Sequence, residues 1–109
     1  MIKIKRGDTF AFYANITDEL GEPLITNIAN LKSQIRDRKH VLVEDLTIST
    51  TITEGQYLFT ATDTNVWLPQ GHTSRNLIMD IEMNIGGIIS SSDTIDIEVT
   101  KDVTYNEWN

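Results

Sequence analysis

The chain has 109 residues, of which 39% are hydrophobic and none is cysteine, so packing alone must hold a single domain without disulfides or thiolate metal sites. The net charge of −7 argues against nucleic-acid binding, because affinity for a phosphate backbone comes from clustered Lys and Arg. No apolar run approaches the ~20 residues of a membrane span, and the first residues lack the apolar stretch of a signal peptide. We therefore expect synthesis in the cytoplasm and no membrane partner.

Segments in which apolar or β-branched residues alternate with polar ones recur along the chain, and this period of two is typical of half-buried β-strands. Turn signals separate these segments at regular intervals. The pattern predicts an all-β fold, an immunoglobulin-like β-sandwich of about seven mainly antiparallel strands. The segments are residues 3–5, 9–17, 28–37, 41–50, 56–62, 76–85, 88–90 and 94–101.

Two neighbouring segments in the middle of the chain need a choice of structure. Residues 28–37 fit a helix, because Leu31 and Ile35 are four positions apart, and also a strand, because Leu31, Ser33 and Ile35 alternate. The β-rich runs on either side favour the strand. Residues 41–50 are then expected to pair with it across the polar turn that separates them.

Glycine and acidic residues mark the turns. Residues 18–23 combine acids with glycine and proline, which predicts a loop. Residues 63–71 are predicted to be irregular or a single helical turn that Asp63 caps. The glycines between strands supply positive φ or tight bends, so their role is fold geometry. These glycines are Gly21, Gly55, Gly71, Gly86 and Gly87.

The inward phases of the clearest strands predict the core. Residues 1–104 form the domain in this interpretation, and residues 105–109 form a short C-terminal tail. The predicted core residues are Phe10, Phe12, Ile35, Tyr57, Phe59, Met79, Ile81, Ile95, Ile97 and Val99.

The sequence contains few residues that could form a catalytic or metal-binding motif. His40 and His72 are the only imidazoles, and neither has a zinc partner nearby in the sequence. Carboxylates crowd residues 18–22 but lack the alternating spacing of an EF-hand loop, which favours solvated charge over a calcium site. We expect no enzymatic activity, no catalytic residue, no cofactor and no metal.

Two short basic clusters occur. They could accept an acidic partner, but solvated strand ends that discourage edge-to-edge pairing are the simpler interpretation. The clusters are Lys3, Lys5 and Arg6, and Arg36, Arg38 and Lys39.

Turn and core residues follow a recognisable order along the chain. The order is Arg6-Gly7-Asp8-Thr9-Phe10, Asp18, Gly21-Glu22-Pro23-Leu24, Gln34-Ile35-Arg36, Gly55-Gln56-Tyr57, Asp63-Thr64, Trp67, Gly71, Asp80-Ile81, Thr94-Ile95, Val99 and Asp102-Val103-Thr104. This order resembles small immunoglobulin-like β-sandwich proteins encoded among the structural genes of tailed bacteriophages and prophages. It is similar to the N-terminal domain of some phage baseplate upper proteins. The turn at residues 72–76 is longer than in that pattern.

The resemblance implies a virion structural or assembly protein of a tail, baseplate, neck or capsid accessory. Such a protein acts through contacts with other virion subunits or with copies of itself. It is expected in the host cytoplasm during synthesis and then in the virion.

Three aromatic residues are the candidate partner contacts. Trp67 is either a lid on the core, which we favour, or a partner contact, while Tyr105 and Trp108 lie on the tail. The alternative function is a carbohydrate- or surface-binding module in which Trp67 or Trp108 stacks on a sugar.

Overall fold

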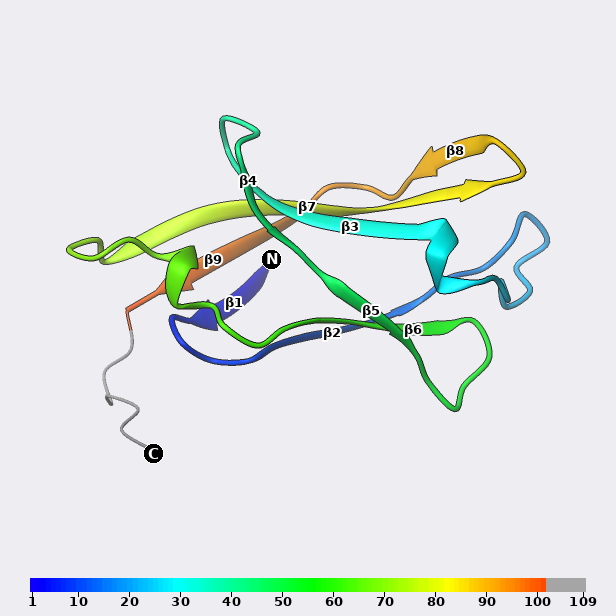
Figure 1. Ribbon diagram of the computed structural model, residues 1–109, viewed down its shortest axis with the longest axis horizontal. Helices are drawn as coiled ribbons and strands as arrows, with labels where there is room; N and C mark the ends of the chain where they lie inside the picture. The colour runs from blue at the N-terminus through cyan, green and yellow to red at the C-terminus, as the bar shows by residue number, and fades with distance from the viewer. Residues whose placement is uncertain (102–109) are drawn as a thin grey trace.

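The computed structural model describes residues 1–101, which form nine strands and two short 3-10 turns (Figure 1). The all-β prediction is confirmed, although about seven strands were expected. The strands are β1 (Ile2–Lys5), β2 (Phe10–Asn15), β3 (Leu31–Asp37), β4 (Leu42–Asp45), β5 (Thr47–Thr50), β6 (Gln56–Ala61), β7 (Ser74–Ile85), β8 (Ile88–Ser91) and β9 (Ile95–Thr100). The 3-10 turns are η1 (Ile28–Asn30) and η2 (Asn65–Trp67).

The strands are divided between two sheets that enclose one core. The larger sheet has the order β1-β9-β7-β3-β4, and β8 also pairs with β7. The smaller sheet has the order β2-β6-β5. Inward side chains from both sheets belong to the same buried cluster, so the two sheets form packed layers.

Strand β7 is the longest and spans the larger sheet from end to end. Its first half pairs with β9 and its last four residues pair with β8, while β3 lies along its other edge. All of these pairs are antiparallel, as expected. Strands β1 and β9 are parallel instead.

The prediction of one strand over residues 41–50 is wrong. Strand β4 belongs to the larger sheet and β5 to the smaller one, so the chain crosses between the layers (Figure 1). Leu46 lies at the crossing point, where its side chain is buried and its N–H donates to the Ser33 carbonyl at 3.0 Å. The crossing links the two sheets along one side of the molecule.

The ambiguous segment 28–37 is mostly a strand. Strand β3 begins at Leu31, and the three residues before it form η1. The Asn27 side chain caps this turn by accepting a hydrogen bond from the Ala29 N–H at 2.9 Å.

Eight of the ten predicted core residues are buried. Phe12 and Ile95 are only partly buried but pack against the core. The other buried apolar residues are Trp67, which the sequence favoured as a lid on the core, and five that were not predicted. These five are Leu31 and Ala61 at strand ends, Leu46 at the crossover, Leu68 after η2 and Leu77 within β7.

The strand registers place the loops at two opposite ends of the molecule. Because Lys5 lies opposite Thr100, Ser74 opposite Thr100, and Phe10 opposite Ala61, the loops next to these residues share one end. The loops at this first end are residues 6–9, 38–41 and 62–73 (Figure 1). The loops at the second end are residues 16–30, 51–55 and 86–87 (Figure 1).

Candidate interaction surfaces

Trp67 is part of the core. Its exposed fraction is 0%, and its ring lies 5.2 Å from the ring of Phe10, centroid to centroid. The indole Nε1 donates a hydrogen bond to Glu44 Oε1 at 2.6 Å, so its one polar atom is satisfied. Trp67 is therefore the core lid. The alternative of a partner or sugar contact at Trp67 is wrong, because no part of its side chain reaches the surface.

Tyr105 and Trp108, the other two candidate contacts, lie outside the described residues. The division between a domain at residues 1–104 and a tail at residues 105–109 falls outside them too. Both remain predictions.

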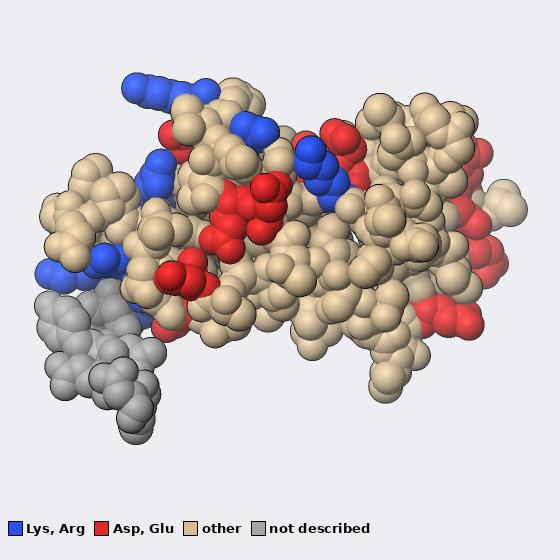
Figure 2. Space-filling view, viewed as in Figure 1, with Lys and Arg blue, Asp and Glu red and all other residues tan. Residues whose placement is uncertain are grey.

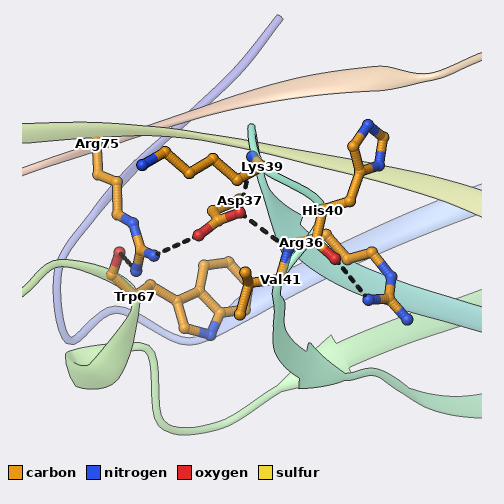
Figure 3. Close-up of polar contacts among 7 residues, drawn as sticks. All are labelled: Arg36, Asp37, Lys39, His40, Val41, Trp67 and Arg75. Carbon is orange, nitrogen blue, oxygen red and sulfur yellow. Dashed lines mark hydrogen bonds and ion pairs between the residues drawn. The ribbon is translucent and has the colours of Figure 1, made fainter.

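Asp37 fixes the turn between β3 and β4 at the first end (Figure 3). Its Oδ1 accepts hydrogen bonds from the N–H groups of Lys39 at 2.8 Å and Val41 at 2.9 Å. Its Oδ2 lies 3.5 Å from Arg75 Nη2, and Arg75 Nη1 donates to the Trp67 carbonyl at 3.3 Å. These contacts tie the turn to the start of β7 and to η2.

The same contacts lower the pKa of the Asp37 carboxyl below its ordinary value. The hydrogen bond from Val41 is the largest cause, and the Lys39 N–H and the Arg75 charge act in the same direction. Partial desolvation opposes them. Asp37 thus stays ionised and holds the turn in place.

Thr64 fixes the turn between β1 and β2 at the same end. The Thr64 hydroxyl accepts a hydrogen bond from the Gly7 N–H at 2.9 Å and donates one to the Asp8 carbonyl at 2.6 Å. Arg6 Nε also donates to the Asn65 carbonyl at 3.1 Å. The β1–β2 turn and the β6–β7 loop therefore form one unit. The Asp63 side chain accepts from the Asn65 N–H at 3.0 Å and so supports the start of η2, although Thr64 and not Asp63 occupies the N-cap position.

Positive charge gathers at this first end, which we call the basic end (Figure 2). Arg38 lies apart from this group, on the outer face of the larger sheet, where it forms an ion pair with Asp96 at 3.1 Å. Arg36 donates to Gln34 and to the His40 carbonyl on the same face. The residues that define the basic end are Lys5, Arg6, Lys39, Arg75 and Lys101.

The opposite end carries the acidic loop that the sequence predicts, and the loop is held firmly. Asp18 Oδ1 accepts from the N–H groups of Leu20 at 2.9 Å and Glu22 at 3.0 Å. The Tyr57 hydroxyl donates to the Leu24 carbonyl at 2.8 Å and accepts from the Thr26 N–H at 3.0 Å. The loop at residues 16–30 is thereby fixed to β6.

A close approach of two loops completes this end. Gly55 has a φ of 76°, and a Cβ added there would lie 2.7 Å from Pro23 Cβ. The Gly55 carbonyl accepts from the Ile16 N–H at 2.8 Å. Only glycine fits this position, which packs the β5–β6 turn against the loop at residues 16–30.

Four carboxylates lie on these two loops, which contain no Lys or Arg, and we call this region the acidic end (Figure 2). All four side chains are exposed. They are Asp18, Glu19, Glu22 and Glu54.

Large apolar side chains are also exposed at the acidic end. Ile88 and Ile89 of β8 are 75% and 62% exposed, and all four residues of this strand are exposed. Gly86 and Gly87 form its turn with φ values of 61° and 84°, as predicted. The exposed apolar residues at this end are Leu20, Ile25, Ile28, Ile52, Ile85, Ile88 and Ile89.

An apolar groove of about 310 Å³ opens beside this end, between the two sheets. Ala14 and Ile16 line it from the smaller sheet, and Ile81 and Met83 line it from β7. Ala14 has a small side chain, whereas Phe10 and Phe12, at the preceding inward positions of β2, have large ones. The groove therefore opens beside Ala14.

A polar groove of about 410 Å³ lies on the outer face of the larger sheet. Lys32, Gln34 and Arg36 line it from β3, and Asp80 and Glu82 line it from β7. Several of these polar groups already bond to protein: Gln34 donates to Asp45 at 2.7 Å, and Lys32 lies opposite Glu82 in the sheet. No Trp, Tyr or Phe lines this groove.

Residues with metal-binding side chains do not converge in residues 1–101. His40 and His72 lie on separate loops of the basic end, and His40 has a φ of 66°. No group of three His, Cys, Asp or Glu side chains in this range is placed to hold a metal ion. No helix within residues 1–101 is long and apolar enough to cross a membrane.

No known family model matches the chain, and no curated protein matches it.

Proposed function

We propose that this protein is a structural or assembly component of a tailed-phage or prophage particle, in its tail, baseplate, neck or capsid accessory. It acts by binding other virion subunits or copies of itself. The observation that carries the proposal is the set of exposed isoleucines at the acidic end, with Leu20, on the loops at residues 16–30 and 51–55 and on the β7–β8 hairpin. Exposed apolar side chains that gather on one region are typical of protein-interaction surfaces.

Ordered loops strengthen this argument. A loop fixed by Tyr57, Asp18 and the Gly55 contact loses little further conformational freedom when a partner binds. Its apolar side chains are therefore ready to dock. The sequence resemblance to phage structural proteins supplies the kind of partner, and the protein would move from host cytoplasm to virion.

Mass spectrometry of purified particles from the source phage tests the proposal. We expect the protein in a stoichiometric amount relative to tail or capsid subunits. Its absence from particles, with the protein present in infected cells, would contradict the proposal.

A carbohydrate-binding module is the second candidate, and the polar groove on the larger sheet is the described surface that favours it. The groove lacks an aromatic platform, and Trp67 cannot supply one because it is buried. A glycan array with the isolated protein separates the two candidates. Selective glycan binding that is lost in Gln34→Ala, combined with absence from particles, would favour the carbohydrate function.

A further inference from the structure

We propose that copies of this protein associate head to tail, with the acidic end of one copy docked on the basic end of the next. This inference rests on the proposed function and names one partner for the same surfaces. It follows from charge and apolar surface at the two ends.

The two ends carry opposite charge. The acidic end has four carboxylates and no Lys or Arg on its loops, which gives −4. The basic end has five cations, and the nearby carboxylates Asp8, Asp37 and Asp63 reduce its charge to +2. In Figure 2 the right edge carries Asp and Glu without Lys or Arg, the left side carries several Lys and Arg, and further Asp and Glu lie across the middle of the face. Complementary charge of this kind orients and selects a partner.

Both ends also expose apolar side chains. Val41, Leu42 and Val66 are exposed at the basic end, on the β3–β4 turn and on η2. Val41 and Leu42 follow Lys39 in the same turn, and Val66 follows Asn65, whose carbonyl accepts from Arg6. A contact between opposite ends would therefore bury apolar surface on both partners, and the charges would surround it.

Like ends are poor partners for each other. Pairing two acidic ends through their β7–β8 hairpins would bring eight carboxylates together, four from each copy, with no cation on the same loops. Such repulsion disfavours a two-fold symmetric dimer at this surface. Contacts between unlike ends are heterologous, so they generate a closed ring or an open filament.

Charge reversal at each end tests the inference. The first variant combines Glu19→Lys, Glu22→Lys and Glu54→Lys, and the second combines Lys5→Glu, Lys39→Glu and Lys101→Glu; all six side chains are exposed. Sedimentation velocity across a range of concentrations at low salt measures self-association. We expect the wild type to associate, and each variant to associate at least about tenfold more weakly.

Mixing the two variants is the decisive measurement. The first variant has positive charge at both ends and the second has negative charge at both ends, so an equimolar mixture should regain association. Added salt should weaken both the wild-type and the mixed complexes by screening the charges. Asp45→Lys is the matched control, because Asp45 is exposed and lies opposite Gln34, which pairs with Asp80 in the middle of β7; it should associate as the wild type does.

Other results would overturn the inference. These are a wild type that stays monomeric at every concentration, association that only one triple variant weakens, or a mixture that fails to associate although both variants fold. Circular dichroism establishes folding, and neutral Gln replacements at the same six positions substitute for a variant that does not fold. The particle experiment does not require self-association in solution, so the two proposals can fail separately.

Discussion

Single polar side chains hold the turns of the basic end in place. Thr64 is the clearest case, since its hydroxyl has no exposed surface and bonds to two backbone groups of the β1–β2 turn. A buried backbone group that loses its partner cannot turn to water instead, so its desolvation is uncompensated.

Thr64→Val should therefore lower the free energy of unfolding by about 1–3 kcal/mol, because the shape is kept but both hydrogen bonds are lost. Urea unfolding measures the change. Thr64→Ser keeps the hydroxyl and serves as the control. An equal loss in the Ser and Val variants would show that the methyl group, and not the hydroxyl, matters.

Asp37 makes the stability of the fold depend on pH. Its pKa is lowered in the folded state, so its ionised form stabilises the fold above the unfolded pKa of about 3.9. This contribution disappears as the pH falls through the lower, folded pKa. Asp37→Asn should thus reduce the melting temperature at pH 7 and make little difference at the acid limit.

Melting temperatures of wild type and Asp37→Asn from neutral to acid pH test this expectation. Asp37→Ala should be the less stable variant at neutral pH, because it also loses the acceptor for Lys39 and Val41. A gap between wild type and Asp37→Asn that widens on acidification would contradict the assigned direction.

At the scale of elements, the acidic end depends on the contact between two loops at Gly55. Gly55→Ala should be more destabilising than Gly21→Ala by about 1–3 kcal/mol, since the new methyl group overlaps Pro23. Gly21 is a matched control because its φ of 79° is similar, while its surroundings are open. Chemical denaturation of both variants measures the difference, and equal losses would rule out the close contact as the cause.

The strands could be predicted from the sequence where the alternation is unbroken, as in β6, β7 and β9. The crossover between β4 and β5 was missed although a signal exists. Val43 occupies an odd position, whereas Leu46 and Ile48 occupy even ones, so the inward face changes between them. A change of phase marks a strand that leaves one sheet for the other, because each sheet needs its own inward face.

At the scale of the whole molecule, the core joins both sheets through the largest buried side chains. Phe59 in the middle of β6 is 0% exposed. Phe59→Ala should cost about 3–5 kcal/mol through lost burial and a cavity. Denaturant unfolding measures this cost, and a loss below about 1 kcal/mol would mean that the site collapses around the smaller side chain.

The overall acidity predicts weak binding to nucleic acid, even with the basic end. We expect no binding to duplex DNA or RNA by fluorescence anisotropy at physiological salt, because the net charge of −7 repels phosphate. Titrations at two salt concentrations check this. Tight binding that falls steeply with added salt would contradict it.

The interaction surfaces were less predictable than the core. The sequence shows that Lys and Arg are missing from residues 7–31 and 40–74, but it does not show where the remaining cations meet. Lys5, Arg75 and Lys101 are far apart in the chain, and the pairing of β1, β9 and β7 brings them to one end. The separation of charge is thus a property of the topology.

Strand β7 also fixes a length. Its twelve residues reach from the loops of the basic end to the hairpin of the acidic end, and neighbouring strands brace both of its edges. At about 3.3 Å per residue it accounts for most of the long dimension of the molecule, which is 46 Å. Because β7 is paired on both edges, the length of each copy should stay constant along an assembly. An open head-to-tail filament would therefore show an axial periodicity near 46 Å in electron micrographs.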